Sequence, residues 1–273
     1  MKKILVPCDF SAPAQEAFKF AVRLATQSKG EIHVLYIVDI TFLRGNPSLS
    51  QSYAFNLNFL KEMEGEADAK FTTMWKKYSP LTLPVKFRHT LGSFPDVKTY
   101  IRENAIDLVI MGTHGQGGAS WGSNTEKIVR HSPVPVLAIR KEPGNDIKKI
   151  LVPVIPDQLD KHFCDKLKQL QAFFNARLYF LWINTPLIFK NDADAHRDLQ
   201  KFASDTNFTD YSLSIRSDYT VEDGIHRFAK DMDADLIAMG THAWKGLVHF
   251  ITGSTAENMV NHESVPIWTC VLS

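Results

Sequence analysis

The chain has 273 residues, enough for roughly two domains of about 100–200 residues each. Hydrophobic residues make up 44% of it and charged residues 22%, as in a soluble globular protein, and its 31 basic and 30 acidic residues leave a net charge of +1. This balance argues against partners held by a broad electrostatic field, so we expect neither a nucleic-acid nor a membrane partner.

Several sequence features point to a reducing compartment. No apolar run approaches the roughly 20 residues of a membrane-spanning helix, and the N-terminal apolar run meets the charge of Asp9 too soon for a signal peptide. The three cysteines, Cys8, Cys164 and Cys270, lie far apart, without a Cys-x-x-Cys pair. We therefore expect a cytoplasmic protein with structural thiols and no metal site.

Strands and helices are expected to alternate in the first half of the chain. A helix capped by Ser11 and tolerating Pro13 in its first turn should follow the first strand, with a buried stripe at Ala14, Ala17, Phe18, Ala21, Leu24 and Ala25. Further helices are expected over residues 60–78, 94–104 and 123–131. The expected strands cover residues 4–7, 31–38, 85–91, 107–112 and 134–139.

The second half repeats this order after a linker rich in turn formers and charge, residues 141–147. Its expected strands cover residues 150–154, 177–183, 211–217, 235–239 and 265–271, with helices between them. Such alternation predicts an α/β fold with mostly parallel sheets and right-handed crossovers. We expect two domains, residues 1–141 and 147–273.

Three blocks of sequence recur in the same order in both halves. Lys2-Lys-Ile-Leu-Val-Pro7 returns as Lys148-Lys-Ile-Leu-Val-Pro153, and Asp107-Leu-Val-Ile-Met-Gly-Thr-His-Gly115 returns as Asp235-Leu-Ile-Ala-Met-Gly-Thr-His-Ala243. Glu126-Lys-Ile-Val-Arg-His131 matches Glu257-Asn-Met-Val-Asn-His262. The period is far longer than that of a solenoid, so the blocks indicate a duplicated domain.

A glycine-containing loop follows the fourth expected strand of each copy. In a doubly wound sheet, ligands bind beyond the carboxyl ends of the strands, where the winding reverses. Glycines let backbone N–H groups approach an oxyanion, and the N-terminus of the next helix adds unsatisfied donors. Such a loop suits a phosphate group without a lysine.

The chain resembles the universal stress proteins in these residues. That family carries Gly-x2-Gly-x9-Gly-[Ser/Thr] after the fourth strand and an Asp after the first, as in Val-Pro-Cys-Asp-Phe-Ser11 and Met-Gly-Thr-His-Gly115 here. His-Ser-Pro-Val-Pro-Val136 is also typical of it. The resemblance covers both repeats and implies two tandem doubly wound domains, each a five-stranded sheet of order 3-2-1-4-5 with helices on both faces. Family members dimerise through the last strand, so the two fifth strands should be neighbours in an intramolecular pseudo-dimer.

Each copy departs from the family pattern at a different end of the expected site. In the first copy only six residues separate Gly115 from Gly122, where the pattern has nine. In the second copy the loop has full length, but Ala243 replaces the second glycine and Ile155 stands where Asp9 would be. We therefore expect the first domain to be the main site for ATP or a related adenine nucleotide, with or without Mg.

The resemblance implies these nucleotide-binding residues. In the first domain they are Pro7, Cys8, Asp9, Val38, Met111, Gly112, His114, Gly115, Gly122, Ser123, Asn124 and Thr125. In the second domain they are Val154, Ile183, Met239, Gly240, His242, Gly253, Ser254 and Thr255.

Structural roles explain some of the same residues. Ser123 and Ser254 each precede a Glu by three residues, which makes a capping box that needs no ligand. Gly112 and Gly240 also fit strand-end turns, and Asp9 fits a helix entry. His114 and His242 fit loop support, since no histidine or cysteine pair has metal-ligand spacing.

Three functions remain open at this point. The leading one is a stress-response regulator that binds an adenine nucleotide without strong catalysis, as a monomeric pseudo-dimer or a homodimer with an unknown protein partner. The alternative is a scaffold that binds no nucleotide and acts through protein contacts. The third is an ATP pyrophosphatase, whose Ser-Gly-Gly-x-Asp-Ser loop is not found after the first strand. No catalytic residue is expected, and any ATP hydrolysis would be slow and incidental.

Overall fold

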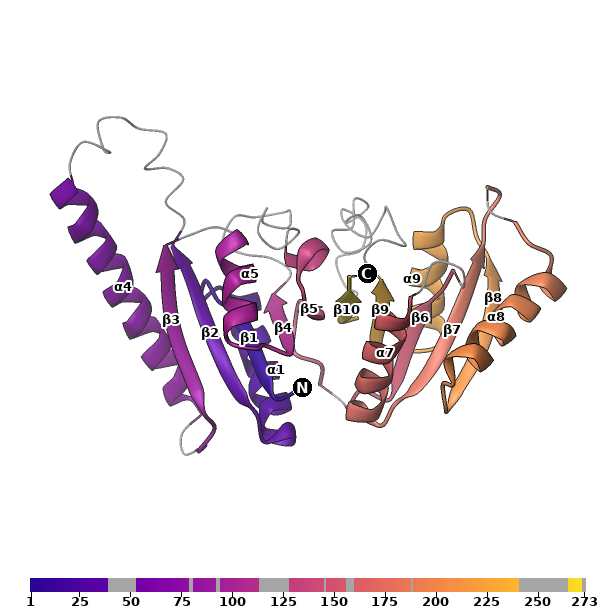
Figure 1. Cartoon of the computed structure of the whole chain (residues 1–273), viewed down its shortest axis with the longest axis horizontal. Coiled ribbons are helices and arrows are strands. Elements are labelled where there is room, and N and C mark those ends of the chain that lie inside the picture. Colours follow the sequence, from indigo (N-terminus) through magenta and orange to yellow (C-terminus); the bar gives the residue numbers. More distant parts are fainter. Residues whose placement is uncertain are drawn as a thin grey trace. The chain divides into compact units, whose positions relative to one another are not determined.

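The computed structural model describes residues 1–38, 53–78, 81–91, 94–112, 128–144, 146–155, 160–187, 189–240 and 265–271. The chain divides into two compact units, Met1–Lys127 and Ile128–Ser273. Each unit has a central sheet with helices packed on it (Figure 1).

The first unit alternates strands and helices as expected. Its sheet has the order β3-β2-β1-β4, and all its pairs are parallel. The elements are β1 (Lys3–Pro7), α1 (Ala12–Ser28), β2 (Glu31–Val38), α4 (Tyr53–Lys76), β3 (Val85–Leu91), α5 (Phe94–Glu103) and β4 (Leu108–Gly112).

The second unit contains the complete predicted strand order. Its parallel strands follow β8-β7-β6-β9-β10, which is 3-2-1-4-5 counted within the repeat. The elements are β5 (Val136–Ile139), β6 (Lys149–Pro153), α7 (Lys161–Phe174), β7 (Arg177–Asn184), α8 (Asp192–Thr206), β8 (Tyr211–Ser217), α9 (Val221–Asp231), β9 (Leu236–Gly240) and β10 (Ile267–Cys270).

The fifth strands of the two repeats pair with each other, as predicted. β5 runs antiparallel to β10, with Leu137 opposite Trp268. Both strands lie in the unit that starts at Ile128, so the fifth strand of the first repeat belongs by its contacts to the second compact unit. The repeat boundaries at residues 141 and 147 stay a prediction, because they describe ancestry and not contacts.

The caps and apolar stripes of the helices follow from their sequences. Ser11 is the N-cap of α1, and its hydroxyl accepts a hydrogen bond from the backbone N–H of Ala14 at 3.4 Å. All six residues of the predicted stripe on α1 are buried. In the second unit α7 and α8 cover one face of the sheet and α9 the other (Figure 1), as right-handed crossovers require.

The aspartate that opens each repeated Asp-Leu block has a structural role that sequence analysis missed. Asp107 Oδ2 accepts hydrogen bonds from the backbone N–H groups of Lys2 (2.7 Å) and Lys3 (3.0 Å). Asp235 Oδ2 does the same for Lys148 (2.9 Å) and Lys149 (2.8 Å). These bonds tie the start of the first strand of each repeat to the start of the fourth.

No described helix is both long enough and apolar enough to cross a membrane.

Candidate functional site

The candidate site of the first unit lies where three parallel strands end. β1 pairs with β2 through Pro7 and Leu35, and with β4 through Leu5 and Val109. Their carboxyl ends therefore share one edge of the sheet. This edge carries Pro7 at the end of β1 with Cys8 and Asp9 after it, Val38 at the end of β2, and Met111 and Gly112 at the end of β4. This is the edge at which doubly wound sheets bind ligands.

Asp9 is fixed at this edge by the turn into α1. Its Oδ1 accepts a hydrogen bond from the backbone N–H of Ser11 at 3.0 Å. Phe10 between them has a φ of 62°, a left-handed conformation that bulky residues rarely adopt. The ring of Phe10 lies 5.6 Å from that of Tyr36. The helix-entry role considered for Asp9 is therefore real, and the strained Phe10 was not predicted.

Cys8 is an interior residue of the site. Its side chain is buried, and its backbone N–H donates to the carbonyl of Leu35 at 3.0 Å. Burial raises the pKa of the Cys8 thiol to about 12, opposed by a hydrogen bond from the Phe10 backbone and assisted by the charge of Asp9. The thiol is therefore protonated at neutral pH and is a poor nucleophile.

Gly112 is needed for close packing between β4 and α1. A Cβ placed on Gly112 would lie 2.7 Å from the carbonyl carbon of Pro13 and 2.8 Å from its oxygen. The first turn of α1 therefore rests directly on the end of β4. This contact brings Gly112 beside the turn that holds Asp9, so the structure places these two predicted residues in one neighbourhood.

The corresponding edge of the second unit is built differently. Val154 N–H donates to Leu181 O at 2.9 Å, matching the Cys8–Leu35 bond, and Ile155 follows where the first unit has Asp9. Asn184, which takes the place of Val38 as the last residue of its strand, is buried. Its Oδ1 accepts from Trp182 Nε1 (2.9 Å) and Lys190 N (3.1 Å), and its Nδ2 donates to Lys190 O (2.9 Å). The Asn184 side chain thus holds the backbone of Lys190, in the segment between β7 and α8, by hydrogen bonds.

The other predicted residues of the second unit are distributed along the same edge. Met239 and Gly240 end β9 and are buried. Ile183 packs against α9, because a Cβ added at Gly224 would lie 2.8 Å from its Cδ1. The remaining predicted residues lie outside the described part of the chain. They are His114, Gly115, Gly122, Ser123, Asn124 and Thr125 in the first repeat and His242, Gly253, Ser254 and Thr255 in the second.

Comparison with known proteins identifies the family. The model of the universal stress protein family matches residues 1–140 and 214–270, which is more than half of the chain. The chain belongs to the universal stress protein family.

Comparison with individual proteins supports the same assignment of this universal stress protein. The universal stress protein Slr1230 of Synechocystis is 24% identical over 292 residues, covering 98% of this chain and 99% of the relative. The universal stress protein MJ0531 of Methanocaldococcus jannaschii is 31% identical over 147 residues, 51% of this chain and 82% of the relative. A crystal structure of a universal stress protein from Archaeoglobus fulgidus has a TM-score of 0.73 at 16% identity, covering 99% of this chain and 98% of that one, and shows the shared fold.

This universal stress protein also buries a polar network at the opposite end of β2. His33 is fully buried; its Nε2 lies 3.1 Å from Glu31 Oε1 and its Nδ1 lies 2.9 Å from the Tyr100 hydroxyl. Because ionised Glu31 only accepts, a neutral imidazole must carry its proton on Nε2 and accept from Tyr100 on Nδ1. Lys86 and Lys3 also pair with Glu31, at 3.3 and 3.6 Å. Sequence analysis placed His33 in the strand expected over residues 31–38 but gave no partner for it.

The protonation of His33 should make stability depend on pH. Burial lowers the pKa of His33, against the opposing hydrogen bond and charge of Glu31. The unfolded chain, with a histidine pKa near about 6.5, therefore binds this proton before the folded chain does. The free energy of unfolding should fall as pH drops from 7 toward 5, by at most about 1.4 kcal/mol per pH unit for one proton. Urea unfolding at several pH values measures the slope.

A matched pair of variants isolates this contribution. His33→Phe should flatten the slope between pH 7 and 5, whereas replacement of the exposed His196 on α8 by Gln should leave it unchanged. The hydrogen bond from His33 lowers the pKa of Glu31. The ionised Glu31 carboxylate therefore contributes to the free energy of unfolding above the usual pKa of a glutamate, and this contribution is lost as pH falls below that pKa. An unaltered slope in His33→Phe would contradict a neutral buried imidazole.

Among the described residues, no group of three or more His, Cys, Asp or Glu side chains is arranged for a metal ion.

Proposed function

We propose that this universal stress protein is a cytoplasmic stress-response regulator that binds an adenine nucleotide in its first unit. The observation that supports the proposal is that Asp9 follows β1 and Gly112 ends the neighbouring parallel strand β4, so both lie at the carboxyl edge of the sheet, near the first turn of α1. The proposed ligand is ATP or a relative, with or without Mg, and the proposed role is binding without strong catalysis. The active form would be one chain or a homodimer, acting on a protein partner rather than on nucleic acid or a membrane.

The residues of the edge suit different parts of such a ligand. A carboxylate at Asp9 can accept hydrogen bonds from the hydroxyl groups of a ribose or from an adenine amino group. The loop that starts at Gly112 would supply backbone N–H groups to the phosphates. In the second unit Ile155 offers no acceptor and Asn184 is already engaged by its own loop. We therefore assign the nucleotide to the first unit.

Substitution of Asp9 tests this assignment. Equilibrium dialysis of the full chain with labelled ATP, with and without Mg, should give measurable binding for the natural sequence and at least about ten-fold weaker binding for Asp9→Ala, because hydrogen bonds to a charged group contribute about 1.5–3 kcal/mol. Asp9→Asn separates the two roles of the side chain: it keeps an oxygen acceptor for Ser11 N–H but loses the charge. It should fold as stably as the natural chain and still bind ATP more weakly.

Two results would count against the nucleotide proposal. The first is the absence of binding at millimolar ATP, and the second is binding that is equal in the natural chain, Asp9→Ala and Asp9→Asn. Either outcome would favour the alternative function, a scaffold that works through protein contacts. That alternative has its own support in three large apolar side chains exposed near the ends of β7 and β8, namely Leu187 (96% exposed), Phe189 (72%) and Tyr219 (84%).

A further inference from the structure

β8 forms an edge of the sheet in the second unit (Figure 1). It pairs with β7 on one side, and no other described strand pairs with it. The hydrogen bonds at its two ends show which way its backbone groups point: Asp210 O accepts from Leu178 N at 3.1 Å, and Asp218 N donates to Asn184 O at 2.9 Å. Even-numbered residues therefore face β7, since backbone groups alternate sides along a strand. The backbone groups that face outward belong to Tyr211, Leu213, Ile215 and Ser217.

This free edge lacks the usual protection against pairing with another chain. Natural sheets guard their edges with charged residues, with prolines or with a covering segment. The sequence of β8 is Tyr-Ser-Leu-Ser-Ile-Arg-Ser, and its one charged residue, Arg216, lies near the end of the strand. Arg177 Nη2 donates to Tyr211 O at 3.3 Å, and a carbonyl oxygen can accept a second bond. The middle of the edge carries Leu213 and Ile215, which are only half-buried.

β3, the third strand of the first repeat, is protected where β8 is not. It too ends the strand order, and Lys86 and Arg88 are exposed in its middle. Two β3 strands paired antiparallel about residue 86, 87 or 88 would set positive charges directly opposite each other, which is unfavourable. The third strands of the two repeats therefore differ in the feature that governs edge pairing, and β8 is the one that permits it.

β8 is complementary to itself in antiparallel pairing. When two copies are centred on Ser214, every residue of the strand has a partner, because Ser214 is the middle one of the seven. Leu213 then lies opposite Ile215 of the second copy, and Tyr211 lies opposite Ser217. These are the residues whose backbone groups face outward, so they can form the hydrogen-bonded pairs of an antiparallel ladder.

The remaining residues of this pairing oppose no like charges. Ser214 meets Ser214 of the second copy on the twofold axis, and Arg216 meets Ser212. Both pairs are of the non-hydrogen-bonded kind, in which the two Cα atoms are about 4.5 Å apart. Arg216 therefore faces a neutral polar residue and not a second charge.

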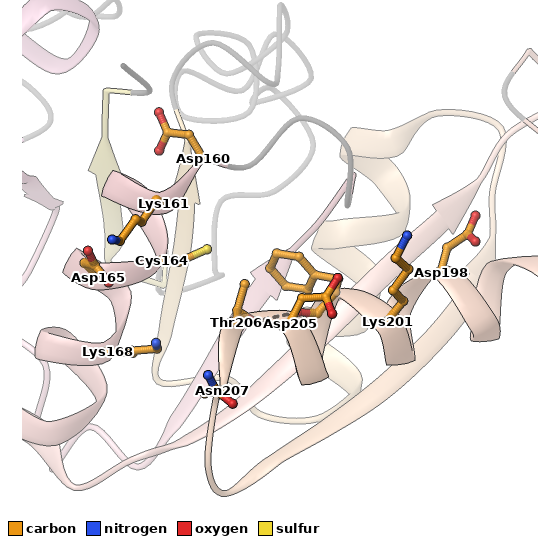
Figure 2. Close-up of a pocket in the computed structure, with 11 residues that line it drawn as sticks. Asp160, Lys161, Cys164, Asp165, Lys168, Asp198, Lys201, Asp205, Thr206 and Asn207 are labelled. Carbon is orange, nitrogen blue, oxygen red and sulfur yellow. Dashed lines mark hydrogen bonds between the residues drawn. The ribbon is translucent and has the colours of Figure 1, made fainter.

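α8 packs on β8 and adds no charge repulsion at this edge. Figure 2 shows Lys201 and Asp205 of α8 beside the open groove that this helix forms with α7. Helical spacing places Gln200 and Ala203 on the side of α8 away from that groove, toward the free edge of β8. Neither of these two residues is charged, so the helices of two copies can approach each other here.

We propose that two copies of this chain pair through β8, antiparallel and about a twofold axis at Ser214. The pairing joins the sheets of the two second units and occupies backbone groups that a single chain leaves open. It also brings Tyr219, which is 84% exposed just after β8, toward the start of β8 in the second copy. The inference rests on the homodimer form of the proposed function but not on nucleotide binding.

Sedimentation equilibrium of the full chain without ATP tests the pairing and should show monomer and dimer in exchange at micromolar concentration. Ser214→Lys should raise the dissociation constant of the dimer at least about ten-fold, because two ammonium groups would meet on the twofold axis. Thr90→Lys is the matched control. It makes the same charge change on β3, on the face that carries Lys86 and Arg88, and should leave the dissociation constant unchanged.

Cysteine cross-linking tests the register and does not depend on the folding of Ser214→Lys. The three natural cysteines are buried, so a new cysteine on β8 is the accessible thiol. Ser214→Cys should form a disulfide between two chains on mild oxidation with diamide, because facing residues on the axis have Cβ atoms about 5 Å apart. Ser217→Cys is the control, since its two copies would lie about 20 Å apart along the strands and should cross-link far less.

Several outcomes would overturn the proposal. They are a chain that stays monomeric throughout the micromolar range, a dimer that folded Ser214→Lys leaves intact, equal weakening by Thr90→Lys, and equal cross-linking of Ser214→Cys and Ser217→Cys. None of these measurements includes ATP. A failure here therefore leaves the nucleotide proposal standing, and a failure of ATP binding leaves the pairing of β8 standing.

Discussion

Replacing Trp268 by alanine should lower the free energy of unfolding by about 3–5 kcal/mol, the usual range for a buried Trp or Phe. Trp268 is fully buried on β10, its ring lies 5.8 Å from that of Phe163 on α7, and it is paired with Leu137 of β5. Its loss leaves a cavity beneath α7 and weakens the junction of the two fifth strands. Urea unfolding followed by circular dichroism measures the change.

Trp268→Phe is the control, because it keeps an aromatic ring and removes a polar atom. The Nε1 of Trp268 is buried and has no hydrogen-bond partner among the described residues. Phenylalanine removes this unsatisfied donor and leaves a smaller cavity, so its cost should be well below that of alanine. If Trp268→Phe proved as destabilising as Trp268→Ala, the packing of an aromatic ring against Phe163 would not explain the contribution of Trp268 to stability.

Replacing Gly112 by alanine should lower the free energy of unfolding by about 1–3 kcal/mol, as overpacking does. The added methyl group would come within 2.8 Å of backbone atoms of Pro13, and a helix backbone cannot give way as a flexible side chain does. The effect is expected in protein free of nucleotide. Denaturant unfolding of such protein therefore separates the packing role of Gly112 from its proposed contribution to ligand binding.

Gly65 on α4 provides the contrast for this experiment. No atom lies within 4 Å of a Cβ added there, so Gly65→Ala should raise stability by about 0.5–1 kcal/mol through helix preference alone. If Gly112→Ala were as stable as the natural protein, α1 would have to shift freely at its first turn. That result would rule out the close contact between Pro13 and β4.

Much of the fold could be predicted because its local patterns agree with its tertiary contacts. The expected bounds of β2, β3 and β8 match the structure. β5 starts later than expected, at Val136 instead of residue 134, because Val134 N–H donates to the Ser132 hydroxyl at 3.3 Å and the Ser132 hydroxyl donates to Val134 O. These two hydrogen bonds between Ser132 and Val134 hold Val134 out of the strand, and the hydrophobic pattern of the sequence does not predict them.

The start of α4 was misjudged for a different reason. The helix was expected only from residue 60, because the apolar stripe that indicated it runs from Leu60 to Tyr78. The structure extends the helix back to Tyr53. An apolar stripe does not mark where a helix begins, because adding residues to an existing helical turn is favourable even where they do not continue the stripe.

The candidate site could be predicted at the level of strand ends but not of side-chain partners. The positions of Asp9 and Gly112 follow from strand order alone. The hydrogen bonds of Asn184 and the left-handed turn at Phe10 depend on residues brought together by folding.

The pairing of β5 with β10 predicts that the two halves of a chain cleaved between these strands stay associated. A protease that cleaves between residues 141 and 147 separates the two repeats covalently, yet leaves β5 on one fragment hydrogen-bonded to β10 on the other. The predicted boundary between the repeats, residues 141–147, therefore differs from the boundary between the compact units, after Lys127. Because β5 and β10 belong to one chain, their pairing does not depend on protein concentration while the chain is intact.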